Sequence, residues 1–176
     1  MITVAIDPGK HGCGVAVFRA TSLADIAQDN KHLLTAAYAP ELPLSADHGL
    51  LLAARAVEVY LRDTFGPLEA ILRITIERPK VYPTAQQKGD QEDITELSVV
   101  VGALLGLLSR HCRDIRLVYP HEWKGQTPKE VTKRQVIDTL TVEEANRIVF
   151  PKQRGLHHNI WDAIALGLWA QERFQG

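Results

Sequence analysis

Residues 2–18 read ITVAIDPGKHGCGVAVF, and this stretch decides the fold. Its first six residues alternate, with Ile2, Val4 and Ile6 on one face and Asp7 ending the other. A proline and a glycine then force a turn, and an apolar run resumes after it. We therefore expect a β-hairpin whose first strand ends in a carboxylate.

The rest of the chain alternates between strand-like and helix-like patterns. Further strands are predicted over residues 33–39, 70–77 and 115–119, and helices over 47–64, 92–110, 128–139, 142–149 and 160–173. This order favours an α/β fold in which helices cover a mixed sheet. Because no repeat, low-complexity tract or long linker interrupts the 176 residues, we expect a single domain over 1–176.

The predicted helix 92–110 carries apolar residues on all sides instead of along one stripe. Such a helix lies either at the centre of a core or in a contact between subunits. Gly102 and Gly106 lie four residues apart and would allow another element to approach closely. The sequence leaves both interpretations open.

The composition is that of an ordinary globular domain, with 45% hydrophobic and 23% charged residues. No apolar run approaches the ~20 residues of a membrane-spanning helix, and the start has no basic region typical of a signal peptide. Two cysteines, Cys13 and Cys112, provide no disulfide framework and fit a reducing cytoplasm. The formal net charge of −1 shows no overall basic excess, but residues 78–89 hold basic and no acidic side chains, which predicts a local positive cleft.

Three carboxylates occupy informative positions. Asp7 ends the first strand, Glu77 ends the strand over 70–77, and Asp162 lies in the first turn of the last predicted helix. Asp7 and Glu77 would lie close together if their strands are parallel neighbours. Asp162 belongs to a helix that is apolar on almost every face, where a carboxylate is costly unless it is paired or binds a metal. Together the three would suit a hard divalent cation such as Mg²⁺.

Each carboxylate also has an ordinary structural explanation. Asp7 precedes a proline–glycine turn, and Glu77 would serve as a solvated strand end. Asp162 would be favoured by the dipole of its helix, with Asn159 as the N-cap. It is the combination of the three that favours a metal site.

The residues around these carboxylates resemble RuvC-type Holliday junction resolvases, within the RNase H-like (retroviral integrase) superfamily. Residues 5–17, 74–79 and 162–167 resemble three acidic motifs of that family, in the same order. Residues 119–124 and 133–136 resemble the stretches that carry two functional lysines. The Pro-x-x-Trp-Lys motif and the histidines that precede the last acidic motif resemble most the phage or prophage members of the family.

The resemblance implies an RNase H-like mixed five-stranded sheet flanked by helices. It also implies a homodimeric, metal-dependent endodeoxyribonuclease that resolves four-way DNA junctions by paired phosphodiester hydrolysis. The enzyme would act in the cytoplasm of a bacterium or a phage-infected host, on branched DNA, and away from any membrane. Its cofactor would be Mg²⁺ or Mn²⁺, two ions per active site.

The same resemblance assigns roles to individual residues. Asp7, Glu77 and Asp162 would be metal ligands and catalytic residues. The family's fourth ligand normally lies three residues before the last acid, where this chain has Asn159, so His158 becomes the candidate ligand and Asn159 the cap. Lys124 and Lys133 would assist catalysis. The polar loop after Glu77 would bind DNA, with Tyr82 as the aromatic wedge, through Arg78, Lys80, Tyr82 and Lys88.

Three other functions remain in competition. Another RNase H-like nuclease would cut forks or RNA–DNA hybrids, although a strand ending in Glu77 favours the resolvase. A sugar-kinase or actin-like ATP-binding module would explain the Asp-Pro-Gly turn, but its second domain and second Asp-Gly loop do not fit in 176 residues. A non-catalytic binding protein on this fold would have no need of all three carboxylates.

Overall fold

The computed structural model describes residues 2–20, 32–40, 49–80 and 91–174. Its centre is one five-stranded sheet in the order β3-β2-β1-β4-β5. The first three strands form an antiparallel meander, and the last two run parallel to β1 on its other side. The bounds are β1 Ile2–Asp7, β2 Gly14–Ala20, β3 His32–Tyr38, β4 Ile71–Glu77 and β5 Asp114–Val118. The predicted mixed five-stranded sheet is therefore confirmed.

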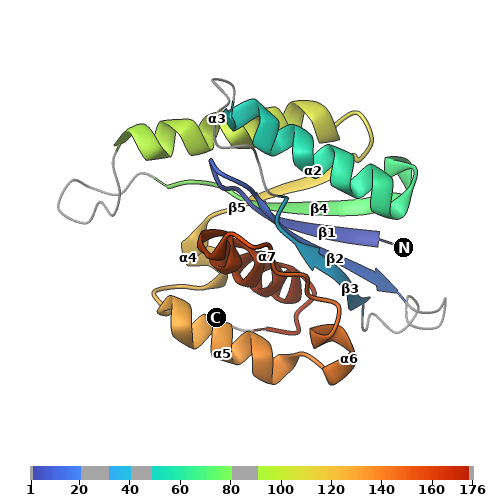
Figure 1. Cartoon of the computed structure of the whole chain (residues 1–176), viewed down its shortest axis with the longest axis vertical. Coiled ribbons are helices and arrows are strands. Elements are labelled where there is room, and N and C mark those ends of the chain that lie inside the picture. Colours follow the sequence, from blue (N-terminus) through green and yellow to red (C-terminus); the bar gives the residue numbers. More distant parts are fainter. Residues whose placement is uncertain (1, 21–31, 41–48, 81–90, 175–176) are drawn as a thin grey trace.

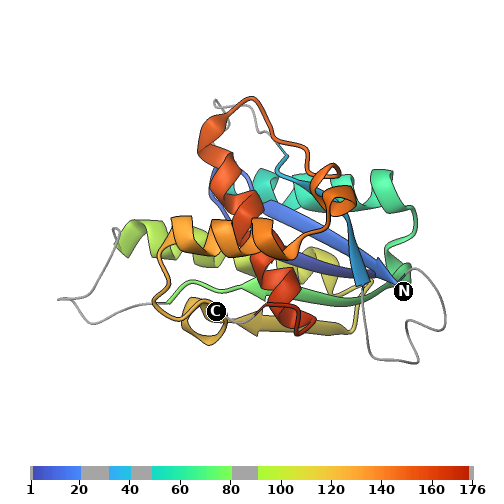
Figure 2. The same ribbon diagram turned by 90° about the horizontal axis from the view of Figure 1, so that it is seen from below.

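Helices cover both faces of this sheet (Figure 1). Helices α2 (Gly49–Phe65) and α3 (Gln91–Leu108) pack against each other on one face. Helix α7 (His157–Ala170) crosses the other face over β1 and β2, and α5 (Lys129–Thr139) packs on α7, as Figure 2 shows. Shorter elements complete the chain: η1 Leu68–Ala70, α4 Pro120–Trp123, α6 Val142–Ala145 and η3 Arg154–Leu156. No helix within these described ranges is both long enough and apolar enough to cross a membrane.

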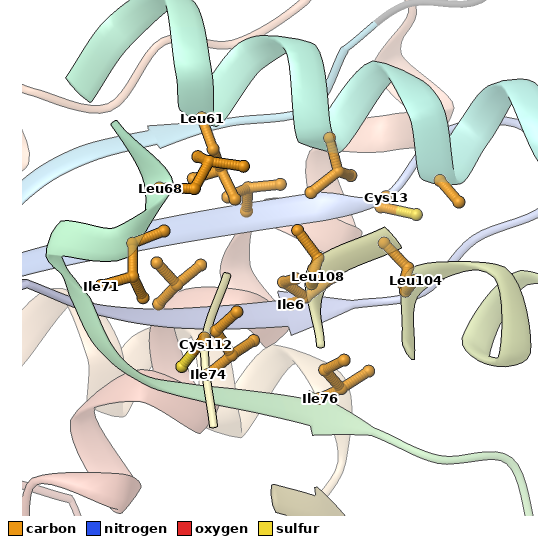
Figure 3. Close-up of a cluster of buried hydrophobic side chains, with 14 of the residues drawn as sticks. Ile6, Cys13, Leu61, Leu68, Ile71, Ile74, Ile76, Leu104, Leu108 and Cys112 are labelled. Atoms are coloured by element: carbon orange, nitrogen blue, oxygen red, sulfur yellow. The ribbon is translucent and has the colours of Figure 1, made fainter. Parts of the chain in front are cut away.

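The alternation of the strands divides the core into two clusters. Ile6, Ile74 and Ile76 point toward α2 and α3, where they meet Leu104 and Leu108 (Figure 3). All five are at most 1% exposed, and full burial of such a side chain stabilises the fold by about 1.5–3 kcal/mol. Successive residues of a strand point to opposite faces. Asp7 follows Ile6, and Glu77 follows Ile76, so both acidic side chains face α7.

Helix α7 lies close to the sheet because one glycine of the helix, Gly167, and one of β2, Gly14, stand at their contact. A Cβ atom at Gly167 would lie 2.1 Å from the Phe18 ring and 3.1 Å from the Ala5 Cβ. A Cβ atom at Gly14 would lie 1.9 Å from the backbone oxygen of Asn159. Backbone atoms cannot move out of the way as a flexible side chain can. These glycines therefore set the depth at which α7 packs on β1 and β2.

The predicted helix 92–110 corresponds to α3, and its two interpretations are partly resolved. Val100, Val101, Leu104 and Leu108 are buried, so one side of the helix belongs to the core as expected. Gly102 and Gly106 lie on the exposed side, and no described atom comes within 4 Å of a Cβ placed at either position. Within the described chain these glycines therefore receive no neighbouring element.

The later helices differ from the prediction at their ends. The helix predicted over 142–149 ends at Ala145, because Ile148 bridges to Ala37 and the Val149 N–H donates to the Ala37 carbonyl at 2.9 Å. The short helix α4 was not predicted, since four residues carry no periodicity. The last helix begins at His157 instead of residue 160. Its earlier start changes the role of the residues just before Asp162.

A buried carboxylate ties together three distant segments. Glu144 is 1% exposed and accepts hydrogen bonds from the backbone N–H groups of Leu34 at 2.8 Å and Thr141 at 3.0 Å. Both terminal nitrogens of Arg173 donate to it as well, at 2.8 and 2.9 Å. Burial alone would raise the pKa of Glu144, but the hydrogen bonds from Arg173 and the backbone outweigh it and hold the pKa at about 2. The ionised carboxylate thus joins β3, α6 and the chain after α7.

We expect Glu144→Gln to lower the free energy of unfolding at pH 7 by about 3 kcal/mol, as loss of one partner of a buried ion pair does. The depressed pKa means that the carboxylate stabilises the fold fully above its ordinary value of 4.5, and that this contribution is lost as the pH falls through about 2. The difference between variant and wild type in urea unfolding should therefore shrink between pH 4.5 and pH 2.

The matched control is Glu143→Gln, because the Glu143 side chain is 79% exposed and forms only an i,i+4 pair with Arg147 among the described residues. It should leave the unfolding curve nearly unchanged. A Glu144→Gln effect that is absent at pH 7, or that stays constant down to the lowest pH, would contradict the proposed role.

Candidate active site

Three carboxylates from separate elements face one another at the end of the sheet. Strands β1 and β4 are parallel with Ile6 beside Ile76, so Asp7 and Glu77 follow at the same sheet edge. Both face α7, which contributes Asp162 from its second turn. The charges of Glu77 and Asp162 both act on Asp7. The structure thus brings together the three carboxylates that the sequence singled out.

Two of these carboxylates are buried, and the Glu77 side chain is 15% exposed. Asp7 is 7% and Asp162 is 6% exposed. Burial raises the pKa of Asp7 well above its ordinary value, and the negative charges of Glu77 and Asp162 raise it further. Burial also raises the pKa of Glu77. Since buried charges are retained only when something opposes them, this site requires positive charge.

Lys124 provides part of that charge. Its ammonium Nζ lies 3.2 Å from Glu77 Oε2 and 3.3 Å from Asp162 Oδ2. Burial by itself would lower the pKa of Lys124, but the carboxylates of Glu77, Asp162 and Asp7 outweigh it and raise the pKa. Lys124 is therefore protonated and neutralises one carboxylate, so that the three carboxylates carry an excess of negative charge whenever all of them are ionised.

Trp123 holds Glu77 in place, a contact that the sequence did not predict. Its indole Nε1–H donates to Glu77 Oε2 at 2.8 Å, and the side chain is 1% exposed. The adjacent Lys124 ammonium lies 4.6 Å from the same ring system. The short helix α4 therefore delivers two neighbouring side chains to one carboxylate. The Trp-Lys pair in the sequence was the available signal, but only the lysine was singled out.

The donor set fits a hard divalent cation. Carboxylate oxygens are the ligands that Mg²⁺ and Mn²⁺ prefer, and a buried excess of negative charge favours a cation. In the described ranges, however, no group of three or more His, Cys, Asp or Glu side chains is arranged to hold a metal ion as it stands. The Lys124 ammonium lies between Glu77 and Asp162 instead. Metal binding here would require that ammonium to withdraw.

The residues just before Asp162 have different roles from those expected. Asn159 is not the N-cap, because α7 already begins at His157 and its cap position is Leu156, which makes no side-chain cap bond. Asn159 is buried and donates its Nδ2–H to the Gly12 carbonyl at 2.8 Å. Its side chain is thus engaged with the turn after β1.

That turn encloses Asn159 closely. A Cβ atom at Gly9 would lie 2.5 Å from Asn159 Nδ2, and Gly12 has φ +152°, a conformation that favours glycine. Together with the contact at Gly14, the turn fastens the first turn of α7 to the end of β1. This attachment fixes the position of Asp162 relative to Asp7.

His158 lies four residues before Asp162 on the same helix, and both line one cavity. Burial and the positive charge of Lys129 lower the pKa of His158, which favours the neutral imidazole that binds metals. Its role as a metal ligand stays a prediction. It remains the candidate, because the Asn159 amide already serves the turn.

The second predicted lysine lies farther from the carboxylates than the first. Lys133 Nζ lies 5.7 Å from the Trp161 ring centroid and forms no ion pair with the described residues. Lys129, one turn earlier on the same face of α5, acts on Asp7 electrostatically and lowers its pKa. Lys129 was not predicted from the sequence, because the lysine motif begins at Lys133, one turn later in the helix.

Two of the four predicted DNA-binding residues lie in the described chain. The Arg78 guanidinium lies 4.3 Å from the Tyr119 ring centroid. Lys80 Nζ lies 5.8 Å from the same ring and 3.3 Å from His121 Nδ1. Both cations therefore gather over Tyr119, directly after Glu77. Tyr82 and Lys88 fall outside the described residues.

Comparisons with known proteins bear on the fold. No protein-family profile and no curated protein sequence matches the chain. RuvC of Thermus thermophilus in complex with a Holliday junction substrate has a TM-score of 0.64 at 19% identity, over 96% of this chain and 92% of that one. The yeast mitochondrial Holliday junction resolvase Ydc2 has a TM-score of 0.54 at 11% identity, over 97% and 79%. The fowlpox virus resolvase with its junction DNA has a TM-score of 0.55 at 13% identity, over 97% and 98%. The chain therefore has the RNase H-like fold of the RuvC-type resolvases.

Proposed function

We propose that this chain is a metal-dependent, structure-selective endodeoxyribonuclease that resolves four-way DNA junctions. One observation supports the proposal most: three carboxylates from β1, β4 and α7 meet, two of them buried and Glu77 15% exposed, and when ionised they carry more negative charge than Lys124 neutralises. The fold supports the choice of substrate, since two of the similar structures contain Holliday junction DNA. A nuclease acting on forks or RNA–DNA hybrids is the alternative that the substrate test must exclude.

Asp7, Glu77 and Asp162, together with His158, would hold Mg²⁺ or Mn²⁺, with two ions in each active site. When bound, such ions activate water and stabilise charge on the phosphate. Trp123 keeps one Glu77 oxygen oriented through its hydrogen bond. Lys124 would exchange its carboxylate partners for the negative charge of the scissile phosphate. Lys133, or its neighbour Lys129, would add a second cation.

The DNA would approach over the positive surface beside these carboxylates. Arg78 and Lys80 follow Glu77 directly and present their charges over Tyr119. Contacts to phosphates make such binding salt-sensitive. Tyr82 and Lys88, which lie outside the described residues, follow in the sequence, and Tyr82 would supply a ring that stacks on an unpaired base.

A four-way junction has two strands to cut, and a two-fold dimer supplies two active sites. The exposed side of α3 is our candidate for the dimer contact. Val99 on that side is 45% exposed, and Gly102 and Gly106 leave open space beside the helix. The homodimer, its cytoplasmic location and an origin in a phage or its bacterial host are parts of the proposal.

The direct test is Asp7→Asn on static four-way junctions with Mg²⁺. We expect cleavage to fall by more than about 100-fold, because the variant loses a charged oxygen at the reacting centre, while junction binding in a gel-shift assay is retained. Since Asp7 is buried beside like charges, removal of its charge should also raise the unfolding temperature. Persistent cleavage would refute the catalytic role. Faster cleavage of an RNA–DNA hybrid than of a junction by the wild type would refute the junction assignment.

A second prediction concerns Trp123→Phe, which keeps an aromatic ring in the core and removes the donor to Glu77 together with part of the indole volume. Cleavage should fall by about 10- to 100-fold, as for loss of other groups that orient a ligand. The Mg²⁺ concentration for half-maximal rate should rise as well, which a purely structural defect would not cause.

The matched control is Trp169→Phe. Trp169 is half-buried in the same helix layer and makes no contact with the carboxylates among the described interactions. Its loss should leave the metal requirement unchanged. Equal metal requirements in wild type and Trp123→Phe would show that the indole does not position Glu77.

A further inference from the structure

A cavity of about 440 Å³ lies beside the carboxylates, between α5 and the start of α7. Figure 2 shows the two helices lying against each other. Asp162 and His158 form the wall that this cavity shares with the candidate active site. Its volume is in the range of small-molecule binding sites. The residues on its other walls have no part in the mechanism proposed above, apart from Lys129 and Lys133.

Aromatic rings form one side of the cavity. The ring centroid of Phe150 lies 5.4 Å from that of Trp161 and 4.9 Å from that of His157. The His157 ring is fixed by a hydrogen bond of 2.8 Å between its Nε2 and the Pro151 carbonyl. Phe150 is nevertheless 41% exposed. A fixed cluster of rings with one exposed member offers a surface on which another flat ring can stack.

Cations surround these rings. Lys129 and Lys133 lie one turn apart on α5, and Arg154 comes from the segment before α7. None of the three forms an ion pair with a residue of the described ranges, although Glu130 also lines the cavity. Unpaired cations beside exposed aromatic rings are the combination that binds single-stranded nucleic acid. The rings accept bases, and the cations accept phosphates.

We propose that this cavity binds an unstacked nucleobase of the DNA strand being cut, next to the scissile phosphate. The base stacks on Phe150, and Lys129, Lys133 and Arg154 bind the flanking phosphates. The inference rests on the proposed function. Asp162 lines the cavity, so a DNA strand whose scissile phosphate lies at the carboxylates would bring a neighbouring nucleotide to the cavity. An unpaired base at a branch point costs less to unstack than a base within a duplex.

The test uses Phe150→Leu, which removes the ring and keeps an apolar side chain. Val149→Ala is the control, since Val149 is 57% exposed and lies outside the cavity lining. Single-turnover cleavage is measured on intact junctions and on junctions with one abasic residue at each position flanking the cut. We expect Phe150→Leu to slow cleavage of the intact junction about tenfold, the effect of losing one base–aromatic stack.

When the abasic residue stands at one particular position, wild-type cleavage should slow by a similar factor. On that same junction, Phe150→Leu should cleave no more slowly than the wild type. Val149→Ala should cleave every junction like the wild type. Wild-type rates for Phe150→Leu on the intact junction would overturn the proposal. The proposal would also be overturned if Phe150→Leu cleaved every abasic junction about tenfold more slowly than the wild type, since the Phe150 ring would then act without a base.

A second measurement does not depend on cleavage. Binding of a short oligothymidylate is followed by quenching of tryptophan fluorescence in EDTA. Phe150→Leu should weaken this binding about tenfold, and Trp161→Phe should remove the quenching. Unchanged affinity in Phe150→Leu would overturn the cavity proposal. If the wild type binds oligothymidylate through Phe150 but cuts no junction, the proposed function fails and the base-binding cavity stands.

Discussion

Lys124 Nζ lies between Glu77 Oε2 and Asp162 Oδ2, at 3.2 and 3.3 Å, and this contact offsets part of the negative charge of the three carboxylates on which the site depends. One ammonium cannot neutralise three carboxylates. Burial and mutual repulsion therefore raise the pKa of Asp7, and burial raises that of Glu77. A fold selected only for stability would not keep such a group of like charges out of water. The cost is understandable if a divalent cation and a phosphate meet there.

The position of α7 gives these charges their geometry. Strand register alone brings Asp7 and Glu77 to one sheet edge, but Asp162 belongs to a helix whose placement depends on packing. The glycines at positions 14 and 167 let the helix backbone touch the sheet, and Asn159 fastens its first turn to the Gly12 carbonyl. The turn after β1 thus serves the active site although none of its side chains is proposed to touch the substrate.

Strand periodicity made much of this predictable from the sequence. Alternation in 2–7 and 70–77 identified the two strands, their buried faces and the carboxylates that end them, and the ordered motifs indicated the fold. Strand periodicity could not predict the contact of Trp123 with Glu77 or the effect of Lys129 on Asp7, because each involves residues far apart in the chain. The prediction that Asn159 is the N-cap was wrong, because the sequence fixes the start of a helix near several polar residues only to within one turn. The cavity at Phe150 depends on the packing of α5 against α7, which no local pattern specifies.

The net charge of −1 is a sum over regions with opposite roles. Buried acids offset cations that gather around Tyr119 and along α5, so the total conceals a positive surface beside a negative centre. The most direct test of this account is a crystal structure of the protein soaked in Mn²⁺, read by anomalous scattering. The account predicts manganese between Asp7, Glu77 and Asp162, with the Lys124 ammonium withdrawn from both of its partners. A map in which Lys124 keeps those contacts and no manganese lies among the carboxylates would contradict it.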